Sequence, residues 1–129
     1  MSPAFTTIPA PEVGKELLRL LPEQGSFELQ RDQSGKTHDW HFHSLDEELF
    51  ILSGQVLLFW VTGRNECHEK YCVPGTWITL PAGTRHGSVA GHEGAVYMIR
   101  PKDGQTAQTT FLRPGECEHP APSFARAGA

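Results

Sequence analysis

Short apolar runs separated by glycine and proline are the feature that most limits how this chain can fold. From Ser26 onward the sequence divides into runs of about five to eight residues, several of which alternate between apolar and polar side chains. Turn-forming dipeptides such as Ser53-Gly54 and Pro74-Gly75 stand between the runs. In a chain of 129 residues with 13 glycines and 10 prolines, this pattern predicts an all-β fold, a barrel or a double sheet.

The runs predict nine strands in a single domain. They lie near Ser26–Arg31, Lys36–His43, Glu47–Leu52, Gln55–Thr62, Glu66–Val73, Thr76–Leu80, His86–Val89, Ala95–Arg100 and Thr106–Phe111. Ahead of them, Pro11–Glu23 contains a candidate short helix with leucines at helical spacing. We therefore expect an N-terminal extension over residues 1–25, a β-barrel over 26–112 and a loosely ordered tail over 113–129.

Charge and composition exclude several classes of function. The net charge is −4 and the lysines and arginines are scattered, so the chain lacks the basic stripe that a nucleic-acid-binding surface requires. No stretch reaches the ~18 apolar residues of a membrane-spanning helix. The three cysteines show no CxxC spacing and no signal peptide is visible, which predicts a cytoplasmic protein.

Three histidines and a glutamate form a candidate metal site. His41 and His43 are two residues apart on a predicted strand, so their imidazoles leave the same face. Glu47 follows a short turn and should lie beside His43 across the strand pair, while His86 comes just after a second turn. Imidazole and carboxylate ligands suit one divalent transition metal such as Fe, Mn, Ni or Zn. On an octahedral ion, four such ligands leave two coordination positions open.

These residues stand in two motifs that resemble those of the cupin superfamily. The first is Gly35-(five)-His41-Phe42-His43-(three)-Glu47-(six)-Gly54, and the second is Gly75-(five)-Pro81-Ala82-Gly83-(two)-His86. The resemblance implies a double-stranded β-helix, or jelly-roll, barrel with His41, His43, Glu47 and His86 as metal ligands. The second motif normally ends with an asparagine, and Ala90 stands at that position here.

Strand alternation gives further expectations about the residues around the motifs. It favours Glu47 over Glu48 as the ligand, since Glu48 should face away from the barrel interior. It places His38 on the face opposite His41, and it places Thr37 and Asp39 on the ligand face, where Asp39 is a candidate partner for an imidazole. Tyr97 and Arg100 should face opposite ways, so that at most one of them lines the cavity.

The resemblance favours a metal-dependent dioxygenase-type enzyme acting on a small molecule, with Glu47 as a candidate general base. A metal-dependent isomerase or lyase, and a non-catalytic binding module, remain alternatives. The run Leu57–Val61 lacks alternation, which predicts a strand covered on both faces and favours a homodimer. No partnership with nucleic acid or membrane is expected.

Overall fold

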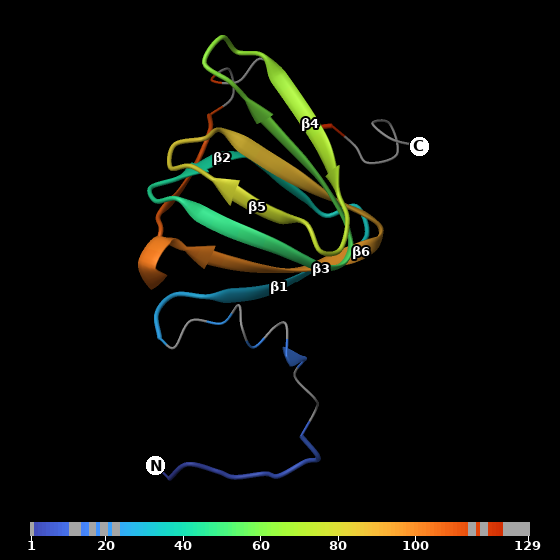
Figure 1. The fold of residues 1–129 in the computed structure, drawn as a ribbon, viewed down its shortest axis with the longest axis vertical. Helices are drawn as coiled ribbons and strands as arrows, with labels where there is room; N and C mark the ends of the chain where they lie inside the picture. Colours follow the sequence, from blue (N-terminus) through green and yellow to red (C-terminus); the bar gives the residue numbers. More distant parts are fainter. Residues whose placement is uncertain are drawn as a thin grey trace.

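The computed structural model describes residues 2–10, 14–15, 18, 21, 24–113, 116 and 119–122, and its strands close into one barrel (Figure 1). The elements are β1 (Glu28–Asp32), β2 (Thr37–His43), β3 (Glu47–Val61), β4 (Cys67–Cys72), β5 (Trp77–Leu80), β6 (His86–Pro101), the 3₁₀ turn η1 (Lys102–Gly104) and β7 (Thr109–Phe111). The all-β prediction is confirmed. The candidate helix over Pro11–Glu23 lies mostly outside the described residues. Among those that are described, no helix is long and apolar enough to span a membrane.

Two long strands, β3 and β6, hold the barrel together. They pair antiparallel from Glu47 opposite Pro101 to Trp60 opposite His86. One half of this ladder is extended by β1, which pairs with β6, and by β5, which pairs with β3. The other half is extended by β4 on β3 and by β2 and β7 beyond β6. The same two strands therefore contribute to both walls of the barrel.

The prediction of nine separate strands is wrong at two places, since β3 and β6 each unite two of the predicted runs. The register of the β3–β6 ladder shifts between Ile51 and Ser53 and again between Gly54 and Val56, while the ladder itself continues. At this point Gly54 pairs with Ala95 and lies against the backbone of Gly94, and the two glycines have positive φ angles of 73° and 76°. Glycine here marks a corner where a strand passes from one wall to the other, rather than a turn that ends it.

The apolar side chains pack in two clusters, one inside the barrel and one outside. Ile51, Leu58 and Tyr97 belong to the inner cluster. The outer cluster is centred on Trp40 and Phe59, whose rings meet edge to face with centroids 4.8 Å apart. The strand over Leu57–Val61 is thus covered on both faces, as predicted.

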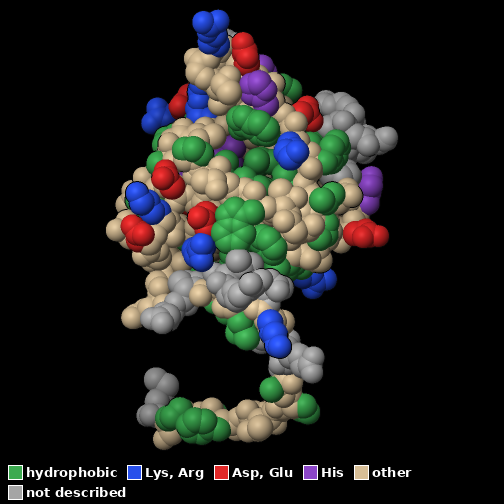
Figure 2. Space-filling view, viewed as in Figure 1, with side chains coloured by type: hydrophobic (Ala, Val, Ile, Leu, Met, Phe, Trp, Pro, Cys, Tyr) green, Lys and Arg blue, Asp and Glu red, His purple; other side chains and the backbone are tan. Residues whose placement is uncertain are grey.

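Residues from the C-terminal part of the same chain help to cover the outer cluster. Leu112 and Ala121 pack against it, and His119 hydrogen-bonds through Nε2 to the Asn65 carbonyl. Figure 2 shows hydrophobic side chains gathered around the middle of one face of the molecule, with charged side chains toward the edges.

The close approach of Gly54 to Gly94 makes a testable prediction. A Cβ at position 54 would lie 2.0 Å from the Gly94 carbonyl oxygen. We expect Gly54→Ala to lower the free energy of unfolding by clearly more than the ~1–2 kcal/mol that a left-handed backbone costs an L-residue, as measured by urea unfolding. Gly35→Ala is the matched control, because Gly35 has a φ of 74° and open space around its Cβ. Equal losses in the two variants would contradict a tight corner.

Candidate metal centre

The ends of three strands bring the predicted ligands together at one end of the barrel. His41 and His43 lie at the end of β2, Glu47 begins β3, and His86 begins β6. His41 and His86 are direct cross-strand partners in the β2–β6 pair. Residues far apart in the sequence therefore meet because the first residues of two strands lie beside the last residues of a third.

The three imidazoles face one another closely. Their ring centroids are 4.9 Å apart for His41 and His43, 4.3 Å for His41 and His86, and 5.1 Å for His43 and His86. One ring nitrogen from each residue lies within 4.8 Å of the other two, so this group can hold a metal ion. Two ligand atoms that each lie ~2.1 Å from one ion are at most about 4.2 Å apart, and the 4.8 Å limit on the distances between these nitrogens is close to that span.

Each imidazole is held in place through its Nδ1 atom. His41 Nδ1 donates to the Asp39 carbonyl at 2.5 Å, and His86 Nδ1 donates to the Thr84 carbonyl at 2.8 Å. His43 Nδ1 lies 3.0 Å from the Thr109 hydroxyl on β7. A proton held on Nδ1 leaves the Nε2 lone pair available, and such contacts commonly orient metal-binding histidines.

Glu47 supplies a buried carboxylate beside these rings. It is 6% exposed, and its Oε1 atom lies 2.9 Å from His43 Nε2. Two ligands at right angles on one ion, each ~2.1 Å away, are about 3 Å apart, so this spacing fits a shared ion. Glu48 faces away and forms an ion pair with Arg100, as strand alternation predicted.

The imidazoles and Glu47 form part of the wall of a cavity of about 340 Å³ inside the barrel. Much of the remaining wall is apolar and includes Leu49, Ile51, Leu58, Ile78 and Ile99. A cavity of this size takes a small molecule, and an apolar wall with a few grouped polar atoms is typical of a ligand site.

No protein-family model matches the chain. Two acireductone dioxygenases from Synechococcus strains, PCC 6301 and RCC307, are each 34% identical to it over 73 residues, or 54% of this chain. The match covers 40% and 39% of their lengths, so the chain spans only about two fifths of these curated relatives.

Solved structures of Bacillus subtilis oxalate decarboxylase superpose on 74% of the chain. One with Mn(II) centres and one determined at pH 4.6 each give a TM-score of 0.62 at 22% identity, covering 26% of the larger protein. This chain has a cupin fold. The jelly-roll architecture that the sequence predicts is thereby confirmed.

The cupin barrel differs from the sequence-based expectation at His38. His38 lines the same cavity as His41 and His43, although its odd separation from His41 predicted the opposite face. The β2–β6 register explains the error. His38 pairs with Ser88 and His41 pairs with His86. The chain therefore moves three residues along β2 between these pairs but only two residues along β6. This β-bulge inserts one extra residue and restores His38 to the ligand face.

The neighbouring expectations have mixed outcomes. Thr37 and Asp39 are exposed and are not among the residues that line the cupin cavity. Asp39 does support an imidazole, but through its backbone carbonyl, while its carboxylate accepts from the Trp40 amide. Tyr97 lines the cavity and Arg100 lies outside it, consistent with the expectation that at most one would. Sequence reasoning gave no signal for the supporting roles of Thr84 and Thr109.

Burial keeps two of the cupin imidazoles neutral. Desolvation lowers the pKa of His86 to about 4. The hydrogen bond from its ring to the Thr84 carbonyl raises this pKa, but by less than burial lowers it. Desolvation also lowers the pKa of His41. Neutral imidazole is the form that binds a metal, so burial prepares both rings as ligands.

This pKa shift predicts how the stability of metal-free protein depends on pH. In the unfolded chain His86 takes up a proton below ~6.5, whereas the folded form resists protonation down to about 4. The free energy of unfolding should therefore fall as pH drops from ~6.5 to ~4, by up to about 3 kcal/mol from His86 alone. Urea unfolding of chelator-treated protein at a series of pH values measures this change in the free energy of unfolding. His86→Asn should flatten this slope, and His92→Asn, at an exposed position, should leave it unchanged.

Proposed function

We propose that this cupin binds one divalent transition-metal ion through His41, His43, Glu47 and His86 and acts as a dioxygenase-type enzyme on a small molecule. The observation that carries the proposal is the set of three imidazoles, each held by Nδ1, whose remaining nitrogens gather beside a buried carboxylate in the cavity wall. The partial similarity to acireductone dioxygenases supports this reaction class.

The donor set indicates which ions fit. Imidazole nitrogen with one carboxylate oxygen suits Fe, Mn, Ni or Zn better than Ca or Mg, which prefer oxygen ligands. Four protein ligands leave positions open for a substrate. A redox-active ion bound there would supply charge stabilisation for an enolate and one-electron chemistry toward dioxygen.

The protein's own residues define the rest of the chemistry. Leu58, Ile78 and the other apolar wall residues exclude water and strengthen electrostatic contacts with a bound substrate. Glu47 is the buried carboxylate beside the imidazoles, placed to accept the proton of an enol or hydroxyl group. These features favour a small substrate that forms an enol or enolate.

A homodimer and a cytoplasmic location stay predictions. The outer face of β3 that suggested a subunit interface is covered partly by Leu112 and Ala121 of the same chain. A dimer would therefore use other surface, for which the exposed Val73 and Trp77 are candidates. Analytical ultracentrifugation decides between monomer and dimer.

Metal content tests the ligand assignment. We expect about one equivalent of metal in the wild type, a loss of most of it in His86→Ala, and a clear reduction in Glu47→Gln. Glu48→Gln is the matched control, because Glu48 is the adjacent carboxylate on the opposite face. Elemental analysis after purification gives the result. Equal metal loss in the two glutamate variants would remove Glu47 from the site.

Oxygen consumption tests the reaction class. Iron- or nickel-loaded protein should consume dioxygen with enediol or diketone substrates. If Glu47 is the base, Glu47→Gln should lower kcat per bound metal ion by about 10²-fold or more. Glu48→Gln should retain activity. Turnover by zinc-loaded protein without oxygen would contradict a dioxygenase and favour an isomerase or lyase that uses the ion as a Lewis acid.

A further inference from the structure

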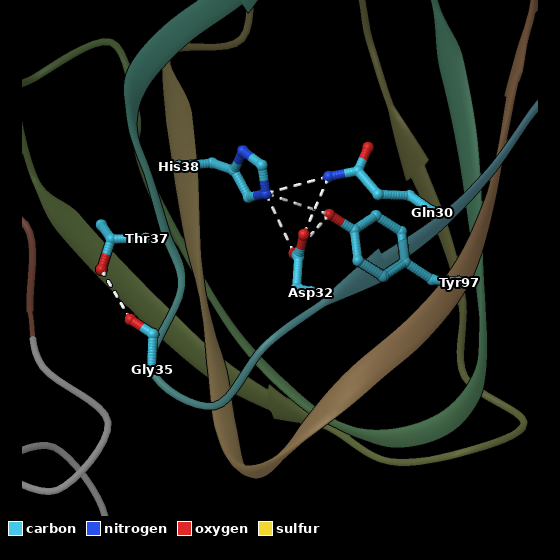
Figure 3. A network of polar contacts seen from close by, with 6 residues as sticks. All are labelled: Gln30, Asp32, Gly35, Thr37, His38 and Tyr97. Atoms are coloured by element: carbon cyan, nitrogen blue, oxygen red, sulfur yellow. Dashed lines mark hydrogen bonds and ion pairs between the residues drawn. The ribbon is translucent and has the colours of Figure 1, made fainter.

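A second polar cluster lines the cavity away from the imidazoles. It consists of Gln30 and Asp32 on β1, His38 on β2 and Tyr97 on β6, hereafter the Asp32 cluster (Figure 3). Gln30, His38 and Tyr97 line the cavity, and Asp32 lies behind them with only 5% of its side chain exposed. The proposed metal chemistry makes no use of this cluster.

Three donors satisfy the Asp32 carboxylate. Tyr97 Oη donates to Oδ2 at 2.8 Å, Gln30 Nε2 donates to Oδ1 at 3.0 Å, and His38 Nε2 lies 2.9 Å from Oδ2. A carboxylate oxygen only accepts, so the last contact requires the proton of His38 on Nε2. Gln30 Nε2 also lies 3.0 Å from His38 Nε2, so the polar atoms of these residues form one connected network.

Gln30 and Tyr97 keep hydrogen-bond acceptors that Asp32 does not use. The amide nitrogen of Gln30 donates to Asp32, which leaves the Oε1 oxygen of Gln30 as an acceptor. Burial and the hydrogen bond to Asp32 raise the pKa of Tyr97, so its phenol keeps its proton and its oxygen keeps lone pairs. The cluster therefore offers acceptors and carries the negative charge of Asp32.

Strand register sets the distance between the cluster and the metal centre. His41 pairs with His86, and His38 pairs with Ser88, two residues further along β6. Because side chains two residues apart on a strand are separated by about 7 Å, the two polar regions lie about that far apart along the barrel. Apolar wall residues such as Ile51 and Leu58 line the same cavity.

We propose that Gln30, His38 and Tyr97 form a substrate subsite that recognises a hydrogen-bond donor, a hydroxyl or an amine, about 7 Å from the group bound at the metal. This deepens the proposed function and rests on it. The substrate would carry an anionic or enol-forming head at the imidazole end and a neutral or cationic donor at the other. A carboxylate at the second end is disfavoured by the buried charge of Asp32.

Hydroxamic acids of graded structure test the subsite by binding alone. Their head group chelates zinc, which is redox-inert, and a chain of about three to five methylene groups spans the required ~7 Å. Four probes of equal length end in a hydroxyl, an ammonium, a methyl ether or a carboxylate. In calorimetry with zinc-loaded protein, we expect the hydroxyl and ammonium probes to bind at least about fivefold more tightly than the ether, the factor for one hydrogen bond. The carboxylate should bind most weakly.

Variants identify the residues responsible. Tyr97→Phe and Gln30→Met each remove one polar group from the cavity wall and should bring the hydroxyl-to-ether ratio toward one. Thr37→Val is the matched control. Thr37 is exposed, lies next to His38 in the sequence, and donates its hydroxyl to the Gly35 carbonyl, so this variant should keep the full hydroxyl-to-ether affinity ratio. Tyr97 is buried, so Tyr97→Phe could fail to fold. Gln30 is only half-buried, and Gln30→Met then provides an independent test.

The outcomes separate the subsite from the proposed function. Equal affinity for hydroxyl and ether probes in the wild type would overturn the subsite alone and leave the Asp32 cluster a structural link between β1, β2 and β6. A ratio that survives the Tyr97 and Gln30 substitutions would overturn it as well. Failure of every hydroxamate to bind zinc-loaded protein would overturn the open metal site, and with it the subsite as part of that function.

Discussion

The antiparallel pairing of β3 with β6 is the constraint on which the other elements depend. Every other strand except β7 pairs with one of these two, and β7 is attached through β2. Where the pair turns from one wall to the other, Gly54 and Gly94 approach so closely that no side chain fits at Gly54. The corner encloses a cavity between the two walls, and the first residues of both strands, Glu47 and His86, fall at the same end of it.

A one-residue irregularity in β2 then determines what the cavity contains. Without the bulge between His38 and His41, strand alternation would place His38 on the outer face, where Trp40 packs. With it, one strand contributes three histidines to the interior: two in the candidate metal centre and one that bonds to Asp32. The bulge thus brings two separate polar regions into a single small cavity.

Local patterns in the sequence predicted much of the fold and the grouping of the candidate ligands, because both depend on short-range periodicity. The spacing of His41 and His43 and the choice of Glu47 over Glu48 follow from strand alternation, and the structure places these side chains accordingly. The errors come from pairing between distant strands. Neither the corner at Gly54 nor the bulge between His38 and His41 is visible until β6 is aligned beside them. The Asp32 cluster was missed for the same reason, since it joins three strands.

The two buried carboxylates, Glu47 and Asp32, have different partners. This difference explains how one cavity can bind a metal ion at one place and recognise a substrate group at another. Glu47 contacts one imidazole and adds negative charge beside the three ring nitrogens, which favours a cation between them. Asp32 is already satisfied by three donors, so it needs no ion and instead orients the atoms that face the cavity. Apolar walls flank both regions and weaken competition from water. A ligand gains the full set of contacts only when its chelating head and its donor group have the spacing of the two regions, so selectivity arises from the register of β2 on β6.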